Sequence, residues 1–162
     1  MSKLTHFNEK GQPRMVDVSD KSDTQRMAIA CCTVYMKPAT LQLIQDKKVA
    51  KGDVLYVAQV AGIMAAKKTS ELIPMCHPLN ITSIELSLEP DPDRERSCIE
   101  IKAQVKITGK TGVEMEALTA VAVAGLTVYD MCKAVDRDIT ISDIRLIEKS
   151  GGKSGEYKRE GT

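Results

Sequence analysis

The fold is decided by residues 81–135, which read ITSIELSLEPDPDRERSCIEIKAQVKITGKTGVEMEALTAVAVAGLTVYDMCKAV. Two segments alternate between apolar and polar residues, and the turn-rich segment from Glu89 to Asp93 separates them. Their apolar positions are Ile81, Ile84, Leu86 and Leu88, then Ile99, Ile101, Ala103, Val105 and Ile107. Because a period of two is typical of half-buried strands, we predict a β-hairpin with one solvated face. A tight connection, Gly109 to Gly112, then leads into the longest predicted helix, roughly Val113 to Val135.

Similar elements precede and follow this stretch. Small and β-branched residues indicate a strand over residues 27–36, and Pro38 suits the first turn of a short helix through Ile44. Asp53 is a favourable N-cap for a second helix, which ends near residue 68, and a last strand covers residues 139–147. If the two early helices form one crossover, the order is β-α-β-β-α-β. This order predicts an α+β fold: a ferredoxin-like antiparallel sheet with helices on one face and an extra short helix in the first crossover.

Length and composition limit the class of protein. The 162 residues suit a single domain, with an N-terminal arm (1–24), a ferredoxin-like core (25–148) and a flexible tail rich in glycine, serine and lysine (149–162). The formal net charge of +1 provides no overall field that would recruit nucleic acid or an anionic membrane. The apolar run from Ala117 to Tyr129 is shorter than the roughly 20 residues that span a bilayer, so we predict a core helix.

Five cysteines without paired C-x-x-C spacing, and no apolar N-terminal signal segment, indicate a reduced cytosolic chain. The chain has two histidines, His6 and His77, which excludes a multi-histidine metal site within one chain. Cys76 and His77 lie between Pro74 and Pro78, and the prolines stiffen this loop, so His77 is either a positioned acid, base or ligand group or a loop residue bonded to backbone. Adjacent ligands without a second matching pair are a weak signal for zinc.

Two Gly-Lys-Thr/Ser sequences, beginning at Gly109 and Gly152, lack the earlier glycine that a phosphate-binding P-loop requires. The first one lies between a strand and a helix, where free backbone N–H groups can hold an anion, although Glu114 and Glu116 would repel a phosphate. These two carboxylates either complement the helix dipole or accept hydrogen bonds from the paired N–H donors of a guanine-like ring. The residues alone leave both interpretations open.

Asp130 and Lys133 stand three residues apart at the end of the apolar helix, so their side chains can meet on one face. An exposed pair would be a structural salt bridge that contributes about 0.2–0.5 kcal/mol. A partly buried pair could instead supply an acid and a base that work near neutral pH. Lysines that are either solvated or available to a triphosphate recur just outside the predicted elements, at Lys51, Lys67, Lys68, Lys149 and Lys153. Arg26 adds a further donor, and the glycines around Lys153 would let the tail close over a ligand.

The segments described above resemble, nearly end to end, the cyclic pyranopterin monophosphate synthase family, also called molybdenum cofactor biosynthesis protein C. The resemblance rests on MVDV (15–18), KGD (51–53), AG (61–62), IPMCHPL (73–79), TGKTGVEMEALT (108–119), YDMCKA (129–134) and KSGGKSG (149–155). The core motifs are unbroken. Met75 stands where leucine is often found, which is a volume-conserving change.

The resemblance implies an enzyme, a phosphorus–oxygen lyase of molybdenum cofactor biosynthesis. Its substrate would be 3′,8-cyclo-7,8-dihydroguanosine triphosphate, a cyclised GTP derivative, and its products cyclic pyranopterin monophosphate and pyrophosphate. The resemblance also implies a ferredoxin-like fold, a homohexamer built as a trimer of dimers with sites at subunit contacts, and no metal or redox cofactor.

The family's site residues can be carried over by position. Asp130 matches the catalytic acid or base, Lys133 its helper, and Lys51 a residue of the same pocket. Substrate-contacting segments match Met75, Cys76, His77, Glu114, Met115 and Glu116. We expect phosphate contacts from Arg26, Lys67, Lys149 and Lys153.

As a hypothesis, a buried Asp–Lys pair relays protons while the ring system opens and recloses, and clustered cations stabilise the departing pyrophosphate. Glu116 and Asp130 are 14 residues apart, or roughly 21 Å along an ideal helix, so we expect a site shared between subunits. RNA-binding domains use the same element order, but they present stacked aromatics, and this chain has one phenylalanine and no tryptophan. A regulatory module that binds a small nucleotide without transforming it remains an alternative, because fold does not determine function.

Overall fold

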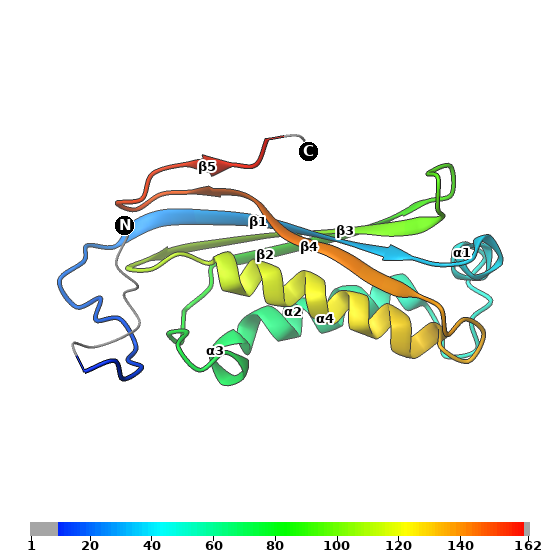
Figure 1. Cartoon of the computed structure of the whole chain (residues 1–162), viewed down its shortest axis with the longest axis horizontal. Helices are drawn as coiled ribbons and strands as arrows, with labels where there is room; N and C mark the ends of the chain where they lie inside the picture. The colour runs from blue at the N-terminus through cyan, green and yellow to red at the C-terminus, as the bar shows by residue number, and fades with distance from the viewer. Residues whose placement is uncertain (1–9, 161–162) are drawn as a thin grey trace.

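The computed structural model describes residues 10–160 of the chain. An antiparallel sheet has the strand order β2-β3-β1-β4-β5, and helices pack on one of its faces (Figure 1). The strands are β1 (Thr24–Tyr35), β2 (Ser83–Asp91), β3 (Cys98–Gly109), β4 (Thr140–Ser150) and β5 (Tyr157–Lys158). The helices are α1 (Pro38–Gln45), α2 (Val54–Lys67), α3 (Thr69–Leu72) and α4 (Glu114–Cys132). The predicted α+β, ferredoxin-like arrangement is confirmed.

The core lies between the sheet and the helix layer. Successive side chains of a strand point to opposite faces, so alternate residues of the two central strands face the helices. These buried residues are Ala28, Ala30, Cys32 and Val34 on β1, and Ile99, Ile101, Ala103, Val105 and Ile107 on β3. At Gly62 of α2, an added Cβ would lie 2.7 Å from Leu86 Cδ2 and 2.9 Å from the Ala120 carbonyl oxygen. Glycine therefore permits the close approach of α2 to α4.

Helix α4 is long and apolar enough to cross a membrane by length and composition. More than half of the apolar stretch of α4 is buried, and the helix packs against α2 and the sheet. The prediction of a core helix is therefore confirmed.

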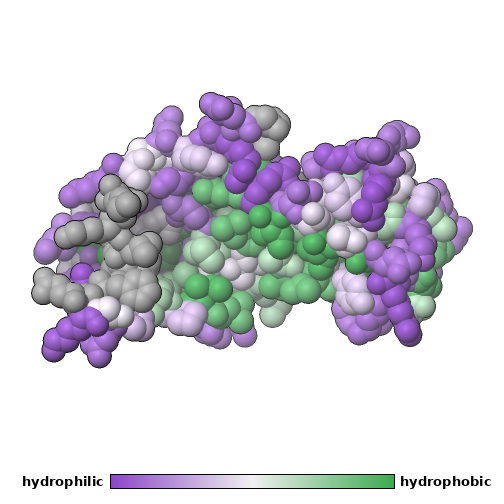
Figure 2. Space-filling view, viewed as in Figure 1, coloured by the Kyte–Doolittle hydropathy of each residue, from purple (hydrophilic) through white to green (hydrophobic). Residues whose placement is uncertain are grey.

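On the side where α4 and β4 lie in front, apolar residues gather over the middle of the molecule (Figure 2). Apolar residues are also exposed on α2. On α2 they are spaced so that they share one face of the helix. We call this group the α2 patch: Tyr56, Val57, Val60 and Met64, which are between 45% and 65% exposed. Leu126 of α4 is exposed as well.

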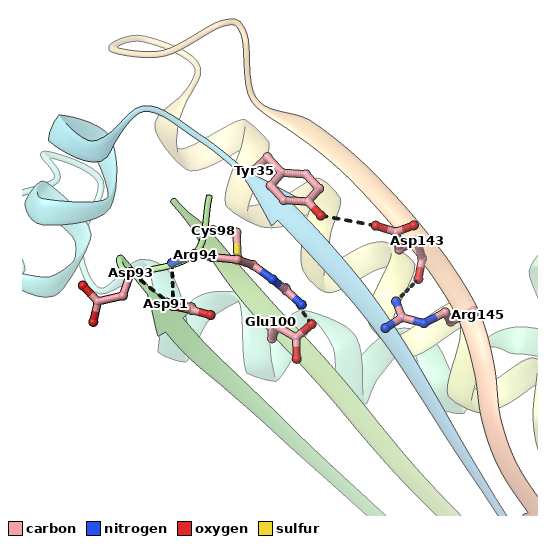
Figure 3. A network of polar contacts seen from close by, with 8 residues as sticks. All are labelled: Tyr35, Asp91, Asp93, Arg94, Cys98, Glu100, Asp143 and Arg145. Atoms are coloured by element: carbon pink, nitrogen blue, oxygen red, sulfur yellow. Dashed lines mark hydrogen bonds and ion pairs between the residues drawn. The ribbon is translucent and has the colours of Figure 1, made fainter. Parts of the chain in front are cut away.

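The opposite face of the sheet carries a polar network (Figure 3). Arg94 Nη1 lies 2.9 Å from Glu100 Oε1, and the Asp91 carboxylate accepts hydrogen bonds from the backbone N–H groups of Asp93 and Arg94. The Tyr35 hydroxyl donates to Asp143 Oδ2 at 3.5 Å. The side chains of this network are thus bonded to polar neighbours.

The structure differs from the sequence prediction mainly at the ends of elements. Helix α4 ends at Cys132 rather than near Val135, and the short elements α3 and β5 were not predicted. The first residues of the expected tail, Lys149 and Ser150, belong to β4, and β5 pairs with the end of that strand. Residues 1–9 of the expected arm and 161–162 of the expected tail lie outside the described residues.

Candidate active site

A cavity of about 380 Å³ lies at the N-terminal end of α4. Three segments line it: arm residues Val16, Val18 and Lys21, the loop that follows α3 (73–79), and the first turn of α4 with the connection before it (111–116). We call it the first pocket. It brings together six predicted substrate-contacting residues: Met75, Cys76, His77, Glu114, Met115 and Glu116. Apolar side chains and a few polar groups therefore share one concave site, as is typical of small-molecule sites.

The polar group with the most unusual surroundings in this pocket is the Glu116 carboxyl. Its residue is only 3% exposed, and burial, with a smaller effect of Glu114, raises the pKa of Glu116 to about 7. Glu116 can therefore exist with or without its proton near neutral pH, as a general acid or base must. Burial, followed by the Glu116 charge, also raises the pKa of the Cys76 thiol, so this thiol stays protonated at neutral pH.

His77 connects the loop to the arm. Its Nε2 lies 2.8 Å from the Val16 carbonyl oxygen. A carbonyl only accepts, so Nε2 must carry a proton, and Nδ1 of the neutral ring is then an acceptor. His77 is thus bonded to backbone, as one of the two interpretations predicts, and it also lines the first pocket. Its role as an acid, base or ligand group stays a prediction.

A second, smaller cavity of about 210 Å³ adjoins the first, because both are lined by Lys21, Thr111, Gly112 and Glu114. We call it the basic pocket, since Lys21, Arg26 and Lys149 line it. Arg26 Nε donates to the Gly109 carbonyl at 2.9 Å, and its Nη2 donates to the Lys110 carbonyl at 3.1 Å. The β4–β5 connection lies close to Arg26: Gly152 has a φ of 75°, and an added Cβ there would lie 2.2 Å from Arg26 Nη1.

Lys149 lies between Glu114 and the tail. Its Nζ is 3.3 Å from Glu114 Oε1 and donates to Ser154 Oγ at 2.5 Å. Both side chains of the Lys149–Glu114 pair are largely buried. The pair therefore stands where the two pockets meet and holds one negative and one positive group against each other.

A cluster of charged side chains lies at the opposite end of α4 from the two pockets. Lys133 Nζ is 2.6 Å from Asp130 Oδ1, and Lys51 Nζ is 3.1 Å from Asp130 Oδ2 and 2.8 Å from the Asp130 carbonyl oxygen. The predicted proximity of these three side chains is confirmed. We call them the Asp130 cluster.

The Asp130 cluster is exposed in the single chain: its side chains are 46% to 59% exposed. Hydrogen bonds from Lys133 and then Lys51 hold the pKa of Asp130 below its usual value, and the Asp130 bond raises the pKa of Lys133. Of the two alternatives that the sequence left open, the isolated chain therefore shows the exposed pair. Pairing rather than burial sets these pKa values, and the pKa of Lys133 is raised rather than lowered. Two ammonium groups around one carboxylate leave a local excess of positive charge.

Two predicted phosphate-binding lysines line neither pocket: Lys67 ends α2, and Lys153 lies in the β4–β5 connection. The arm residues that line the pockets, Val16, Val18 and Lys21, were not predicted as site residues. Val16 and Val18 belong to the MVDV motif (15–18), but its apolar side chains indicate no chemistry, and the arm reaches the site only through tertiary contacts. Among residues 10–160, no group of three or more His, Cys, Asp or Glu side chains is arranged to hold a metal ion.

Known proteins resemble the chain over nearly its whole length. A family model described as the MoaC family matches residues 15–152. The cyclic pyranopterin monophosphate synthase of Thermoanaerobacter sp. (strain X514) is 63% identical over 157 residues, which cover 97% of this chain and 98% of the relative. The enzyme of that name from Pelotomaculum thermopropionicum is 60% identical over 161 residues, with 99% and 94% covered. The one from Magnetococcus marinus is 56% identical over 160 residues, with 99% and 97% covered. The matched span contains the first pocket and the Asp130 cluster.

Proposed function

The chain belongs to the MoaC family, and on this basis we propose that it is a cyclic pyranopterin monophosphate synthase of molybdenum cofactor biosynthesis. It converts 3′,8-cyclo-7,8-dihydroguanosine triphosphate into cyclic pyranopterin monophosphate and pyrophosphate. The observation that carries this proposal is the pair of adjoining pockets, one apolar with a titratable carboxyl and one basic, within a chain so similar to the named synthases. The apolar pocket suits the ring of the substrate, and the basic pocket suits its triphosphate.

The first pocket is the proposed site of the guanine-derived ring. Met75, Leu79 and Met115 supply apolar contacts, and the Glu116 carboxyl can accept hydrogen bonds from the paired N–H donors of the ring. With a pKa of about 7, Glu116 can also take up or release a proton as the ring system rearranges. Of the two interpretations of Glu116, we therefore propose hydrogen bonding to the ring rather than an interaction with the helix dipole alone.

The basic pocket is the proposed site of the triphosphate. An alcohol oxygen of the substrate attacks the phosphorus nearest the sugar, the bond from that phosphorus to the pyrophosphate oxygen breaks, and a base takes the alcohol proton. Arg26 and Lys149 stabilise the charge that develops on the departing pyrophosphate. Lys67 and Lys153 remain proposed phosphate contacts; Lys153 requires closure of the β4–β5 connection over the ligand.

The Asp130 cluster is proposed to supply the remaining acid–base groups from a neighbouring subunit. Asp130 and Glu116 lie on one continuous helix, 14 residues and roughly 21 Å apart, too far to act on one substrate from the same chain. The protein is therefore a homo-oligomer, for which we propose a hexamer of three dimers. Burial of the cluster at the subunit contact would make its pair a stronger proton relay.

We also propose that the enzyme works in the cytoplasm, without nucleic acid, membrane, metal or redox cofactor. These proposals follow from its small-molecule substrate and from proton and phosphoryl chemistry that side chains can perform.

Turnover of the cyclised GTP derivative tests the proposed function. Purified protein should convert it into a pterin product, detected by mass spectrometry, with release of one pyrophosphate per product. A chain that binds the derivative but never releases pyrophosphate would be a nucleotide-binding regulatory module instead.

A further inference from the structure

The N-terminal arm is fixed at two of its backbone carbonyls, one held by His77 of the first pocket and one by Lys110, which precedes the lining residue Thr111. His77 bonds to the Val16 carbonyl oxygen, and Lys110 Nζ donates to the Ser19 carbonyl oxygen at 2.7 Å. Immediately after this second anchor, the backbone N–H of Lys21 donates to the Val18 carbonyl at 3.1 Å and closes a turn. The arm therefore places Lys21 at a defined position beside the site, although it belongs to no helix or strand there.

That position is the junction of the two pockets. Lys21 lines both of them, together with Thr111, Gly112 and Glu114. A substrate with its ring in the first pocket and its phosphates in the basic pocket must pass this junction. The groups at the junction then face the sugar and the phosphate nearest to it.

The cationic side chains of the site differ in whether they already have hydrogen-bond or ion-pair partners. Arg26 donates to two backbone carbonyls, and Lys149 is held by Glu114 and Ser154. The Lys21 side chain is exposed, and among residues 10–160 its ammonium has no hydrogen-bond or ion-pair partner. An arriving phosphate would have to displace an existing partner of Lys149, but none of Lys21.

We propose that Lys21 is a triphosphate-binding residue, and that the arm is part of the substrate site rather than a peripheral segment. The proposal rests on the proposed function for the identity of the ligand. The ammonium of Lys21 binds the phosphate nearest the sugar, and there it stabilises the charge that develops when the bond to pyrophosphate breaks. Its anchors, His77 and Lys110, are positioning residues for this contact.

Binding of inorganic tripolyphosphate and turnover of the cyclised GTP derivative test the proposal together. Lys21→Met keeps most of the aliphatic side chain and removes the charge. Because a charged hydrogen bond is lost, it should weaken tripolyphosphate binding in calorimetry, and lower kcat/KM, by about 10- to 100-fold. Lys21→Arg should recover most of both losses. Lys102→Met, at an exposed position on the opposite face of the sheet, is the matched control and should behave as the wild type.

The two measurements separate the failure of this proposal from the failure of the proposed function. If the wild type turns over the derivative and folded Lys21→Met protein matches it in both assays, the assignment of Lys21 is wrong and the function stands. If the wild type makes no product but Lys21→Met still loses tripolyphosphate binding, the function is wrong and Lys21 remains an anion-binding residue. A wild type that does not bind tripolyphosphate overturns the assignment of Lys21.

Discussion

Three carboxyl groups on or beside α4 differ in their surroundings, and those surroundings decide what each can do. Glu116 is buried beside apolar side chains, and its pKa rises to about 7. Asp130 is exposed between two lysines, which hold its pKa down. Burial alone would raise the pKa of Asp136, but hydrogen bonds from the Lys37 N–H, the Thr40 hydroxyl and the Asp138 N–H outweigh it and lower that pKa. In the single chain, Glu116 is suited to proton transfer and Asp136 to structure. Asp130 is held as a charged group there, and its proposed acid–base role depends on burial of its pair at a subunit contact.

The raised pKa of Glu116 predicts a pH-dependent loss of stability. The folded protein binds a proton at Glu116 up to about pH 7, whereas the unfolded chain releases it near the ordinary value of 4.5. The free energy of unfolding should therefore fall between pH 5 and pH 8, by at most about 3 kcal/mol. Urea unfolding at the two pH values measures this. Glu116→Gln should remove that part of the fall, whereas Glu89→Gln on β2 should keep it. An identical pH dependence in wild type and Glu116→Gln would show that Glu116 is ionised normally.

The catalytic assignment of Asp130 predicts a loss of rate without a loss of fold. Asp130→Asn keeps the size of the side chain but removes the base, so turnover should fall by about 10²–10⁴-fold, the range for lost general acid–base catalysis. Asp46→Asn is the matched control, because Asp46 is also an exposed carboxylate that accepts from a lysine, Lys48, at 3.0 Å. Steady-state kinetics and circular dichroism measure both variants. Near-normal turnover in folded Asp130→Asn protein would reduce the pair to a surface salt bridge.

At the scale of elements, α1 depends on a residue that lies 99 positions after its N-cap in the sequence. This helix has eight residues, and its N-cap, Lys37, makes no side-chain cap bond. The buried Asp136 carboxylate takes that role: it accepts from the Lys37 N–H at 2.9 Å and from the Thr40 hydroxyl at 3.0 Å. Asp136 thereby ties α1 to the connection between α4 and β4, close to the Asp130 cluster.

Removal of the Asp136 cap should lower the free energy of unfolding. Asp136→Ala leaves buried donors unsatisfied, so the free energy of unfolding should drop by about 2–4 kcal/mol in urea titrations. Asp138→Ala removes an exposed partner of Lys37 and should cost under about 1 kcal/mol. Equal losses in the two variants would argue against Asp136 as the cap of α1.

The predictable elements are those with a long periodic pattern. The β2–β3 hairpin and α4 follow from alternation and from an apolar run, and the Asp53 cap of α2 is confirmed by its bond to the Tyr56 N–H. Helix α3 and strand β5 have four and two residues, too few to show a period. The role of Asp136 and the place of Lys21 depend on partners far away in the sequence. Local patterns contain no information about such contacts.

At the scale of the whole molecule, the single chain keeps the two halves of the proposed site apart. The pockets lie at the N-terminal end of α4 and the Asp130 cluster at its C-terminal end. Helix α2, which packs beside α4, exposes the α2 patch. Contiguous exposed apolar side chains are typical of interaction sites, and a second copy of the chain would cover them. The α2 patch is therefore our proposed subunit contact.

A charge placed in the α2 patch should dissociate the oligomer. Val60→Glu would bury a carboxylate without a partner in the contact, whereas in the isolated chain Val60 is exposed and the change is tolerated. Light scattering should report several chains for the wild type and a lower mass for Val60→Glu. Lys48→Glu, beyond the end of α1, should leave the mass unchanged. A wild-type monomer with full activity would contradict both the contact and the shared site.

The shared site is tested most directly by mixing two variants, Glu116→Gln and Asp130→Asn. Each should be nearly inactive alone, because each lacks one proposed acid–base group of the site. Suppose that each site takes its pockets from one subunit and its Asp130 cluster from another. In an equal mixture assembled at random, the pocket subunit carries Glu116 in half of the sites, and the other subunit carries Asp130 in half of the sites. Both groups are then present together in one site out of four. Co-refolded mixtures should then recover about a quarter of wild-type turnover, although each variant alone stays nearly inactive. Native mass spectrometry confirms that mixed oligomers form. Mixed oligomers with no more activity than the separate variants would contradict a site shared between subunits.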